Sequence, residues 1–153
     1  MEKRFEMFTV LTTSIGRSIR KIKNAEMMEY DLKAPHVTCL YYLYSCGPMT
    51  AKDLCELCEE DKANMSRIID YLEKRDFITC SSTSSRRYRC LWSLKEQGIE
   101  VSEFISRKID DVLGAAGDGI TEEDRTVMYS CLERINTNLQ KICNEYEGEK
   151  VEK

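Results

Sequence analysis

The strongest constraint on the fold comes from residues 50–94, where two short helical patterns precede two alternating ones. Thr50 and Asp53 have the spacing of an N-terminal capping box, and apolar residues follow at helical intervals up to Cys58. A second helical pattern over 62–75 directs one apolar face inward, made by Met65, Ile68, Ile69 and Leu72. Two short helices joined by a tight turn predict a helix-turn-helix.

The pattern then changes to the two-residue period of strands. Residues 77–80 predict a short strand, and residues 81–85 a polar turn. A second strand is predicted where apolar residues alternate with polar or basic ones, at Tyr88, Cys90, Trp92 and Leu94. Trp92 is expected to anchor the core beneath this hairpin. A helix-turn-helix followed directly by a β-hairpin is a winged helix.

Further helical patterns flank this region, over 5–29, between Pro35 and Gly47, over 96–113 and from Thr121 onward. The predicted fold is therefore mainly α, with a small β-hairpin wing. We expect one domain over 1–153, in which residues 33–95 form the winged helix-turn-helix lobe. Residues 1–32 and 96–146 form a helical region beside it.

Composition excludes several classes of protein. Apolar residues make up 42% of the 153 residues and charged residues 33%, which is typical of a globular domain. The longest apolar run, over 39–44, is far shorter than the roughly 20 residues of a membrane span. The N-terminus resembles no signal peptide, so the eight cysteines favour a reducing cytoplasm over a disulfide framework.

Charge is unevenly distributed along the chain. The whole chain carries −4, but residues 62–90 hold seven basic and three acidic residues, which leaves +4 there. A local basic segment can bind phosphate within an acidic protein.

Five short segments, in this order and spacing, resemble the MarR (multiple-antibiotic-resistance regulator) family of transcription factors. They are Gly47-Pro48-Met49-Thr50, Leu54-Cys55-Glu56-Leu57, Met65-Ser66-Arg67, the run from Leu72 to Ile78, and Leu94-Lys95-Glu96-Gln97-Gly98. The chain departs from the family pattern in three places. Arg86, Arg87 and Tyr88 stand where the wing usually has an acid before arginine, Lys95 replaces a threonine, and Asp76 replaces a glycine.

The resemblance implies a sequence-specific regulator, a repressor more often than an activator, that binds double-stranded DNA as a homodimer. Residues 1–32 and 96–146 would then form the dimerisation region, and the operator would be near-palindromic. The family's small-molecule effectors bind where the dimerisation helices meet the DNA-binding lobe. Here that region could include Phe8, His36, Tyr41 and Tyr42, although these residues would equally suit the core.

The predicted DNA contacts come from the second short helix and the wing. Lys62, Asn64, Ser66 and Arg67 lie on the outward positions of that helix, where asparagine suits an adenine edge and arginine a guanine edge. In the wing, Arg86, Arg87 and Arg89 are expected to contact phosphate or a narrow minor groove. Lys52 is a weaker candidate for phosphate. The simpler alternative for these residues is a solvated surface.

The remaining candidate chemistry is limited. Cys80 and Cys90 are expected to lie opposite each other across the hairpin, where oxidation could bridge them, so a redox-sensing regulator stays open. Cys55 and Cys58 are interpreted as small apolar residues. With a single histidine, the sequence predicts no zinc site, no cofactor and no enzyme. A winged helix that binds a protein partner instead of DNA is the other alternative.

Overall fold

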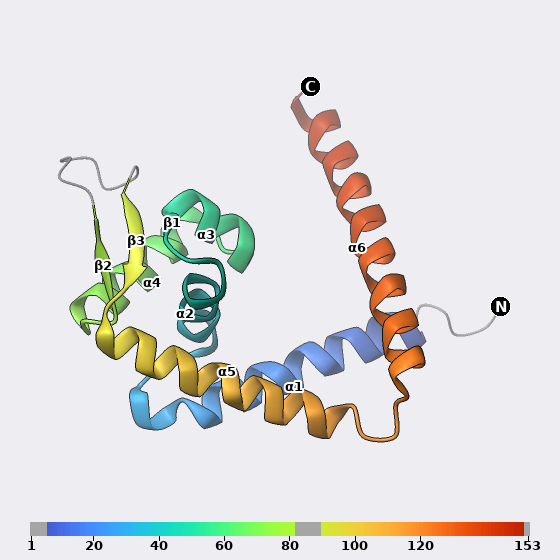
Figure 1. Cartoon of the computed structure of the whole chain (residues 1–153). Helices are drawn as coiled ribbons and strands as arrows, with labels where there is room; N and C mark the ends of the chain where they lie inside the picture. The colour runs from blue at the N-terminus through green and yellow to red at the C-terminus, as the bar shows by residue number, and fades with distance from the viewer. Residues whose placement is uncertain (1–5, 82–89, 152–153) are drawn as a thin grey trace. The chain divides into compact units, whose positions relative to one another are not determined.

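The computed structural model describes residues 6–81 and 90–151 (Figure 1). The elements in chain order are the π-helix η1 (Glu6–Val10), α1 (Leu11–Glu26), the 3-10 helix η2 (Met28–Tyr30), α2 (Ala34–Cys46), β1 (Met49–Thr50), α3 (Ala51–Cys58), α4 (Lys62–Lys74), β2 (Ile78–Cys80), β3 (Leu91–Leu94), α5 (Glu96–Ala116) and α6 (Glu122–Val151). The mainly helical fold with a small antiparallel sheet confirms the predicted winged helix.

Local capping fixes where the two helices of the helix-turn-helix begin. At α3, the Thr50 hydroxyl accepts a hydrogen bond from the Asp53 backbone N–H at 3.2 Å, and the Asp53 carboxylate accepts one from the Thr50 N–H at 3.0 Å. This reciprocal pair confirms the predicted capping box. At α4, the Asp61 carboxylate accepts from the Asn64 N–H at 2.8 Å. Between the helices, Glu59 has a left-handed backbone, with φ at 55°.

The sheet has three strands in the order β1-β3-β2, all antiparallel. The hairpin of β2 and β3 was predicted, whereas β1 was not, because two residues are too few to show an alternating pattern. In β1, Met49 pairs with Trp92 and Thr50 with Leu91. The register of the hairpin pairs Cys80 with Trp92, so the expectation that Cys80 lies directly opposite Cys90 is wrong.

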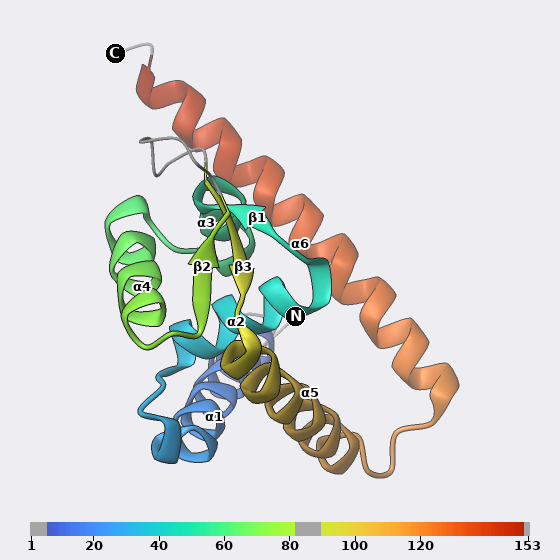
Figure 2. The ribbon, with the colours of Figure 1, turned by 60° about the vertical axis from the view of Figure 1, so that its left-hand side comes forward.

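The core lies where α2, α3, α4 and the beginning of α5 meet the sheet. Its largest fully buried side chains include Trp92, Phe77, Leu40, Leu54 and Met65. Trp92 is the predicted anchor under the wing. In Figure 2, α4 lies beside β2, and α3 lies beside β1. Burial of this apolar surface orients both helices of the helix-turn-helix against one sheet.

Gly98 permits a close approach between the start of α5 and the backbone before β2. A Cβ atom at this position would lie 2.0 Å from the carbonyl oxygen of Phe77. The same oxygen accepts a hydrogen bond from the Lys95 backbone N–H at 2.9 Å. The first turn of α5 therefore rests directly on the backbone that enters β2, which only glycine allows.

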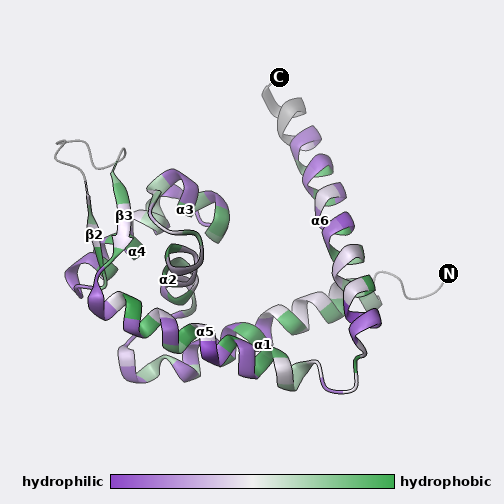
Figure 3. Ribbon diagram, in the orientation of Figure 1, coloured by the Kyte–Doolittle hydropathy of each residue, from purple (hydrophilic) through white to green (hydrophobic). Residues whose placement is uncertain are grey.

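The chain divides into two compact units, Met1–Asp110 and Asp111–Lys153. The first contains the winged helix, and the second contains the end of α5 and the whole of α6. Along α6, hydrophobic and hydrophilic residues alternate in short segments (Figure 3). In the part of the chain that the structure describes, no helix is long and apolar enough to span a membrane.

Candidate nucleic-acid interface

The N-terminal half of α4 presents a polar face to solvent. Lys62, Ser66 and Arg67 are exposed there, while the opposite face of the helix is buried through Met65 and Ile68. Lys62 and Ser66 are four residues apart and therefore share one side of the helix. This half of α4 can enter a groove without loss of core packing, as a recognition helix must.

Asn64 differs from the other three predicted contacts. Its side chain is half-buried, and its amide donates a hydrogen bond to the Glu60 carboxylate at 2.5 Å. Its backbone N–H is the donor to Asp61 in the N-terminal cap. Asn64 therefore joins the turn to the helix in this structure, and its amide would have to leave Glu60 to pair with a base.

A groove of about 620 Å³ separates the polar faces of α3 and α4. Its apolar wall includes Cys55, Met65, Ile69 and Trp92. Lys52 and Lys62 also line it, together with Glu56 and Asp70. Lys52 is highly exposed, and its ammonium lies 3.7 Å from Glu56. An exposed pair of this kind is weak, so Lys52 can exchange it for phosphate at little cost.

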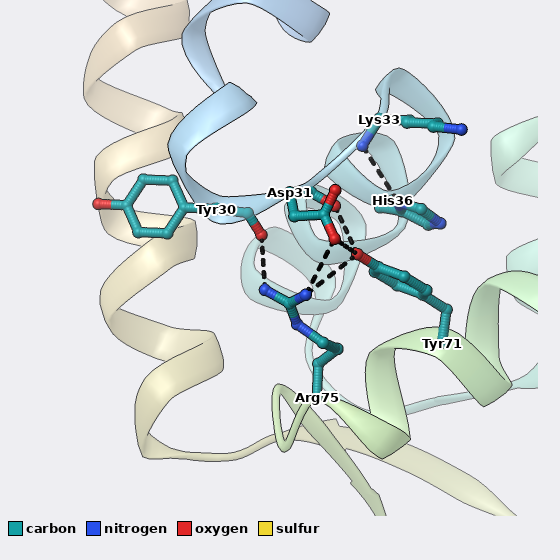
Figure 4. Close-up of polar contacts among 6 residues, drawn as sticks. All are labelled: Tyr30, Asp31, Lys33, His36, Tyr71 and Arg75. Carbon is teal, nitrogen blue, oxygen red and sulfur yellow. Dashed lines mark hydrogen bonds and ion pairs between the residues drawn. The ribbon is translucent and has the colours of Figure 1, made fainter.

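The other end of α4 is bonded to the connection between α1 and α2 (Figure 4). The Tyr71 hydroxyl lies 2.5 Å from the Asp31 carbonyl oxygen and 3.0 Å from its carboxylate. The Arg75 guanidinium donates to the Asp31 carboxylate at 3.1 Å and to the Tyr30 carbonyl at 3.0 Å. Asp31 itself has a left-handed backbone, with φ at 55°. We call Asp31, Tyr71 and Arg75 the α4 anchor.

His36 packs against this anchor. Its ring stacks on Tyr71 with centroids 4.3 Å apart, and its Nδ1 accepts a hydrogen bond from the Lys33 backbone N–H at 3.0 Å. Burial lowers the pKa of His36 below its ordinary value, with Lys33 and Arg75 acting in the same direction and Asp31 against them. Burial and the Asp31 hydrogen bond raise the pKa of Tyr71. The neutral forms of both side chains are therefore favoured.

The predicted effector residues fall into separate contacts. Phe8 lies in η1 with 41% of its surface exposed, and His36 belongs to the stack on Tyr71. Tyr41 and Tyr42 contact each other edge to face, with centroids 5.7 Å apart. None of the four lines the groove between α3 and α4.

Of the wing, the structure describes only the base. Arg86, Arg87 and Arg89 lie outside the residues that the structure describes. Cys80 and Cys90, at the base of the wing, are joined by a disulfide with Cα atoms 5.8 Å apart. Cys90 is fully buried. The bond links diagonal neighbours on one face of the sheet, because both cysteines share the face of Trp92.

None of the three residues of the α4 anchor was predicted, and only the neighbouring His36 was named as a candidate. Tyr71 and Arg75 are four residues apart on α4, which shows that they share a side of the helix. Their partner Asp31 is 40 residues from Tyr71 in the sequence, and nothing local indicates that pairing. The spacing of these two side chains was the one available signal.

Together, the turn, the exposed face of α4 and the adjoining hairpin define a winged helix-turn-helix protein. Residues 32–87 match the family model described as the MarR family. This match agrees with the resemblance that the five sequence segments indicated. A comparison with curated protein sequences gives no match.

Solved structures share the fold at low sequence identity. The MarR protein from Peptoclostridium difficile is 18% identical, with a TM-score of 0.81 over 92% of each chain. The Staphylococcus aureus MarR in complex with salicylate and kanamycin is 16% identical, with a TM-score of 0.81 over 92% of this chain and 95% of that one. The Staphylococcus aureus MepR–DNA complex is 18% identical, with a TM-score of 0.76 over 86% and 97%.

Proposed function

We propose that this protein is a DNA-binding transcription regulator, and that α4 enters the major groove. The observation that carries the proposal is the exposed polar face formed by Lys62, Ser66 and Arg67 on a helix whose other face is fully packed. The MarR family domain and the similarity to MepR, solved in complex with DNA, support it. In this proposal Arg67 pairs with a guanine edge, and Lys62 and Lys52 contact phosphates.

Fluorescence anisotropy with the duplex upstream of the protein's own gene, in excess competitor DNA, tests the proposal. Arg67→Ala should weaken binding by about 1–3 kcal/mol and relax base preference at one position. Arg107→Ala on α5 is the matched control, because it removes the same charge from another exposed helix face. Equal binding by wild type and both variants would show that α4 is not the reading helix.

We further propose that the regulator is a homodimer and binds a near-palindromic operator. Support comes from α1, where Leu11, Ile15 and Ile19 are exposed and no residue is buried. On α6, a second set of apolar side chains is exposed, comprising Val127, Met128, Leu132, Leu139 and Ile142. Monomeric proteins rarely expose large apolar patches. A second copy of the chain would cover it.

Effector control and repression complete the proposal. The α4 anchor supports effector control, because Asp31 directly joins the connection between α1 and α2 to α4. A molecule bound among Phe8, His36, Tyr41 and Tyr42 would act on α4 through this connection. Salicylate, present in the Staphylococcus aureus MarR structure, is a suitable first probe. Release of the duplex by salicylate in wild type but not in Tyr41→Ala would support this site. Release from both proteins would place the effector elsewhere.

A redox-sensing regulator is the second candidate, and the disulfide between Cys80 and Cys90 favours it. The bond closes the chain at the base of the wing that carries the three arginines. We expect reduction of wild type to change duplex affinity, and Cys80→Ser to match the reduced protein without responding to reductant. The same affinity for all forms would remove this candidate.

A further inference from the structure

His36 lies where the beginning of α2 meets the C-terminal half of α4 (Figure 4). It is the third residue of α2, and its Nδ1 accepts a hydrogen bond from the Lys33 backbone N–H at 3.0 Å, just before the helix. Its ring lies flat on the Tyr71 ring, with the centroids 4.3 Å apart and the planes at 4° to each other. One imidazole therefore caps α2 and covers a side chain of the α4 anchor.

The hydrogen bond with Lys33 exists only while the imidazole is neutral. A neutral ring has one nitrogen that accepts and one that donates, whereas both nitrogens of a protonated ring carry hydrogen. In the present geometry, protonation would set two donors against each other, the Nδ1–H and the Lys33 N–H, across 3.0 Å. The ring would have to turn, and the first turn of α2 would lose its cap.

The charged groups around His36 come from both segments that pack on it. Burial lowers the pKa of the ring, Lys33 and Arg75 act in the same direction, and Asp31 acts against them. For a protonated ring, the attractive partner among these groups is the Asp31 carboxylate. That carboxylate already accepts hydrogen bonds from Tyr71 and Arg75. An imidazolium that turns toward Asp31 therefore competes with the α4 anchor.

We propose that His36 is a positioning residue for α4, and that its protonation weakens DNA binding by releasing the α4 anchor. This inference rests on the proposed function, in which α4 enters the major groove. Tyr71 and Arg75 hold the C-terminal half of the helix, so they fix the orientation in which its N-terminal half presents Arg67. A helix that must be ordered again on binding loses part of the free energy of association to that ordering. Proton binding and DNA binding then oppose each other.

The direction of this effect separates it from ordinary electrostatics. Between pH 7.5 and 5, protonation adds positive charge to the protein, which by itself strengthens attraction to DNA phosphates. Release of the α4 anchor predicts the opposite result, weaker binding in acid. The chain has one histidine, and no other type of side chain has an ordinary pKa inside this interval.

Duplex affinity at pH 7.5 and pH 5, at constant ionic strength, tests the proposal. Fluorescence anisotropy with the duplex upstream of the protein's own gene measures it. We expect wild type to bind about three- to tenfold more weakly at pH 5, within the limit of about tenfold per pH unit that one proton allows. His36→Gln should show no loss in acid, because glutamine also serves at this position of a capping box and does not titrate.

The outcomes of this experiment separate the two proposals. Wild-type affinity that is unchanged or stronger at pH 5 would overturn the role of His36, and so would an equal loss in His36→Gln. No binding by wild type at pH 7.5 would overturn the proposed function and, with it, any effect of His36 on DNA.

Hydrogen exchange tests the release of the anchor without DNA. The amides of Arg75, Asp76 and Phe77 close the end of α4 on carbonyls of residues 71–73. After correction for the intrinsic effect of pH, the segment 71–77 should lose protection between pH 7.5 and 5 in wild type, while 101–108 in α5 keeps it. His36→Gln should keep protection in both segments. Equal protection of 71–77 at both pH values in wild type, or an equal loss in both segments, would contradict the release of the anchor.

Discussion

Single residues determine how α5 meets the wing. The missing side chain of Gly98 lets the first turn of α5 approach the Phe77 carbonyl, and Lys95 bonds to the same oxygen. Asp76, which precedes this carbonyl by one residue, has φ at 64°, a left-handed conformation that glycine adopts most readily. Its carboxylate forms an ion pair with Lys95. Asp76 therefore stands where the family pattern has glycine, and it keeps the left-handed backbone conformation that glycine adopts most readily.

Gly98→Ala should destabilise the protein by about 1–3 kcal/mol, because the new methyl group meets backbone that cannot move freely. The gain in helix propensity, about 1 kcal/mol, is too small to compensate. Urea unfolding at fixed protein concentration measures the change. Gly114→Ala, in the same helix with nothing within 4 Å of the added Cβ, should instead be neutral or stabilising. Equal stability of the two variants would refute the close approach.

His36 should make stability depend on pH. Its pKa in the folded protein lies below the ordinary value of 6.5, so the unfolded chain binds a proton more readily. The contribution of neutral His36 to the free energy of unfolding is fully present above about pH 6.5. It is lost as the pH falls through the lower pKa that His36 has in the folded protein. Urea unfolding between pH 7.5 and 5 should show this loss in wild type. His36→Gln should lack it, and as the chain has one histidine, an unchanged slope would contradict the assignment.

At the scale of elements, the helices were predictable and their long-range contacts were not. The caps of α3 and α4 and their apolar faces depend on residues three or four apart, so the sequence displays them directly. The strand β1 exists only because Met49 pairs with Trp92, more than 40 residues away. The predicted helix over 5–29 is instead divided into η1, α1 and η2, with buried Met27 between the last two.

The exposed face of α1 should control association. Ile15→Glu places a charge among the apolar side chains of α1, and a symmetric dimer would contain it twice. If about 3 kcal/mol of the free energy of association is lost because these side chains are no longer buried, the dimer should associate roughly a hundredfold more weakly. Sedimentation velocity at several protein concentrations measures the association. Thr13→Glu, on the opposite side of α1, is the control and should associate like wild type. A wild-type protein that is already monomeric would contradict the proposed dimer.

At the scale of the whole molecule, the net charge is unfavourable for DNA binding, and the basic residues are concentrated in residues 1–23 and 62–90, each of which carries +4. The net charge is −4, so the proposed binding would depend on local contacts at α3, α4 and the wing. The sequence shows the basic segment 62–90, and the structure leaves Lys62 and Arg67 exposed in the first half of α4, whereas Arg75 bonds to Asp31. The sequence alone could not predict the hydrogen bond from the Asn64 amide to the Glu60 carboxylate, because that hydrogen bond depends on the conformation of the turn.

Salt dependence should distinguish DNA binding from protein binding. Each neutralised phosphate contributes about −0.9 to the slope of log K against log salt. We expect a steep slope for wild type, and Lys62→Ala should make it shallower by about 1, because one phosphate is no longer neutralised. Lys108→Ala, whose ammonium pairs with Glu26 at 3.1 Å, should keep the wild-type slope. Weak binding with a shallow slope would favour a winged helix that binds a protein partner.

The short strand β1 has a consequence for chimeric regulators. Thr50 pairs with Leu91 in the sheet and also caps α3, so the helix-turn-helix lies between β1 and β2, which both pair with β3. A segment limited to α3 and α4 would leave behind the backbone that orients its first residue. Residues 49–94 are therefore the smallest segment to exchange between relatives when a recognition helix is transplanted. A graft with those boundaries carries its own starting cap, sheet and buried tryptophan.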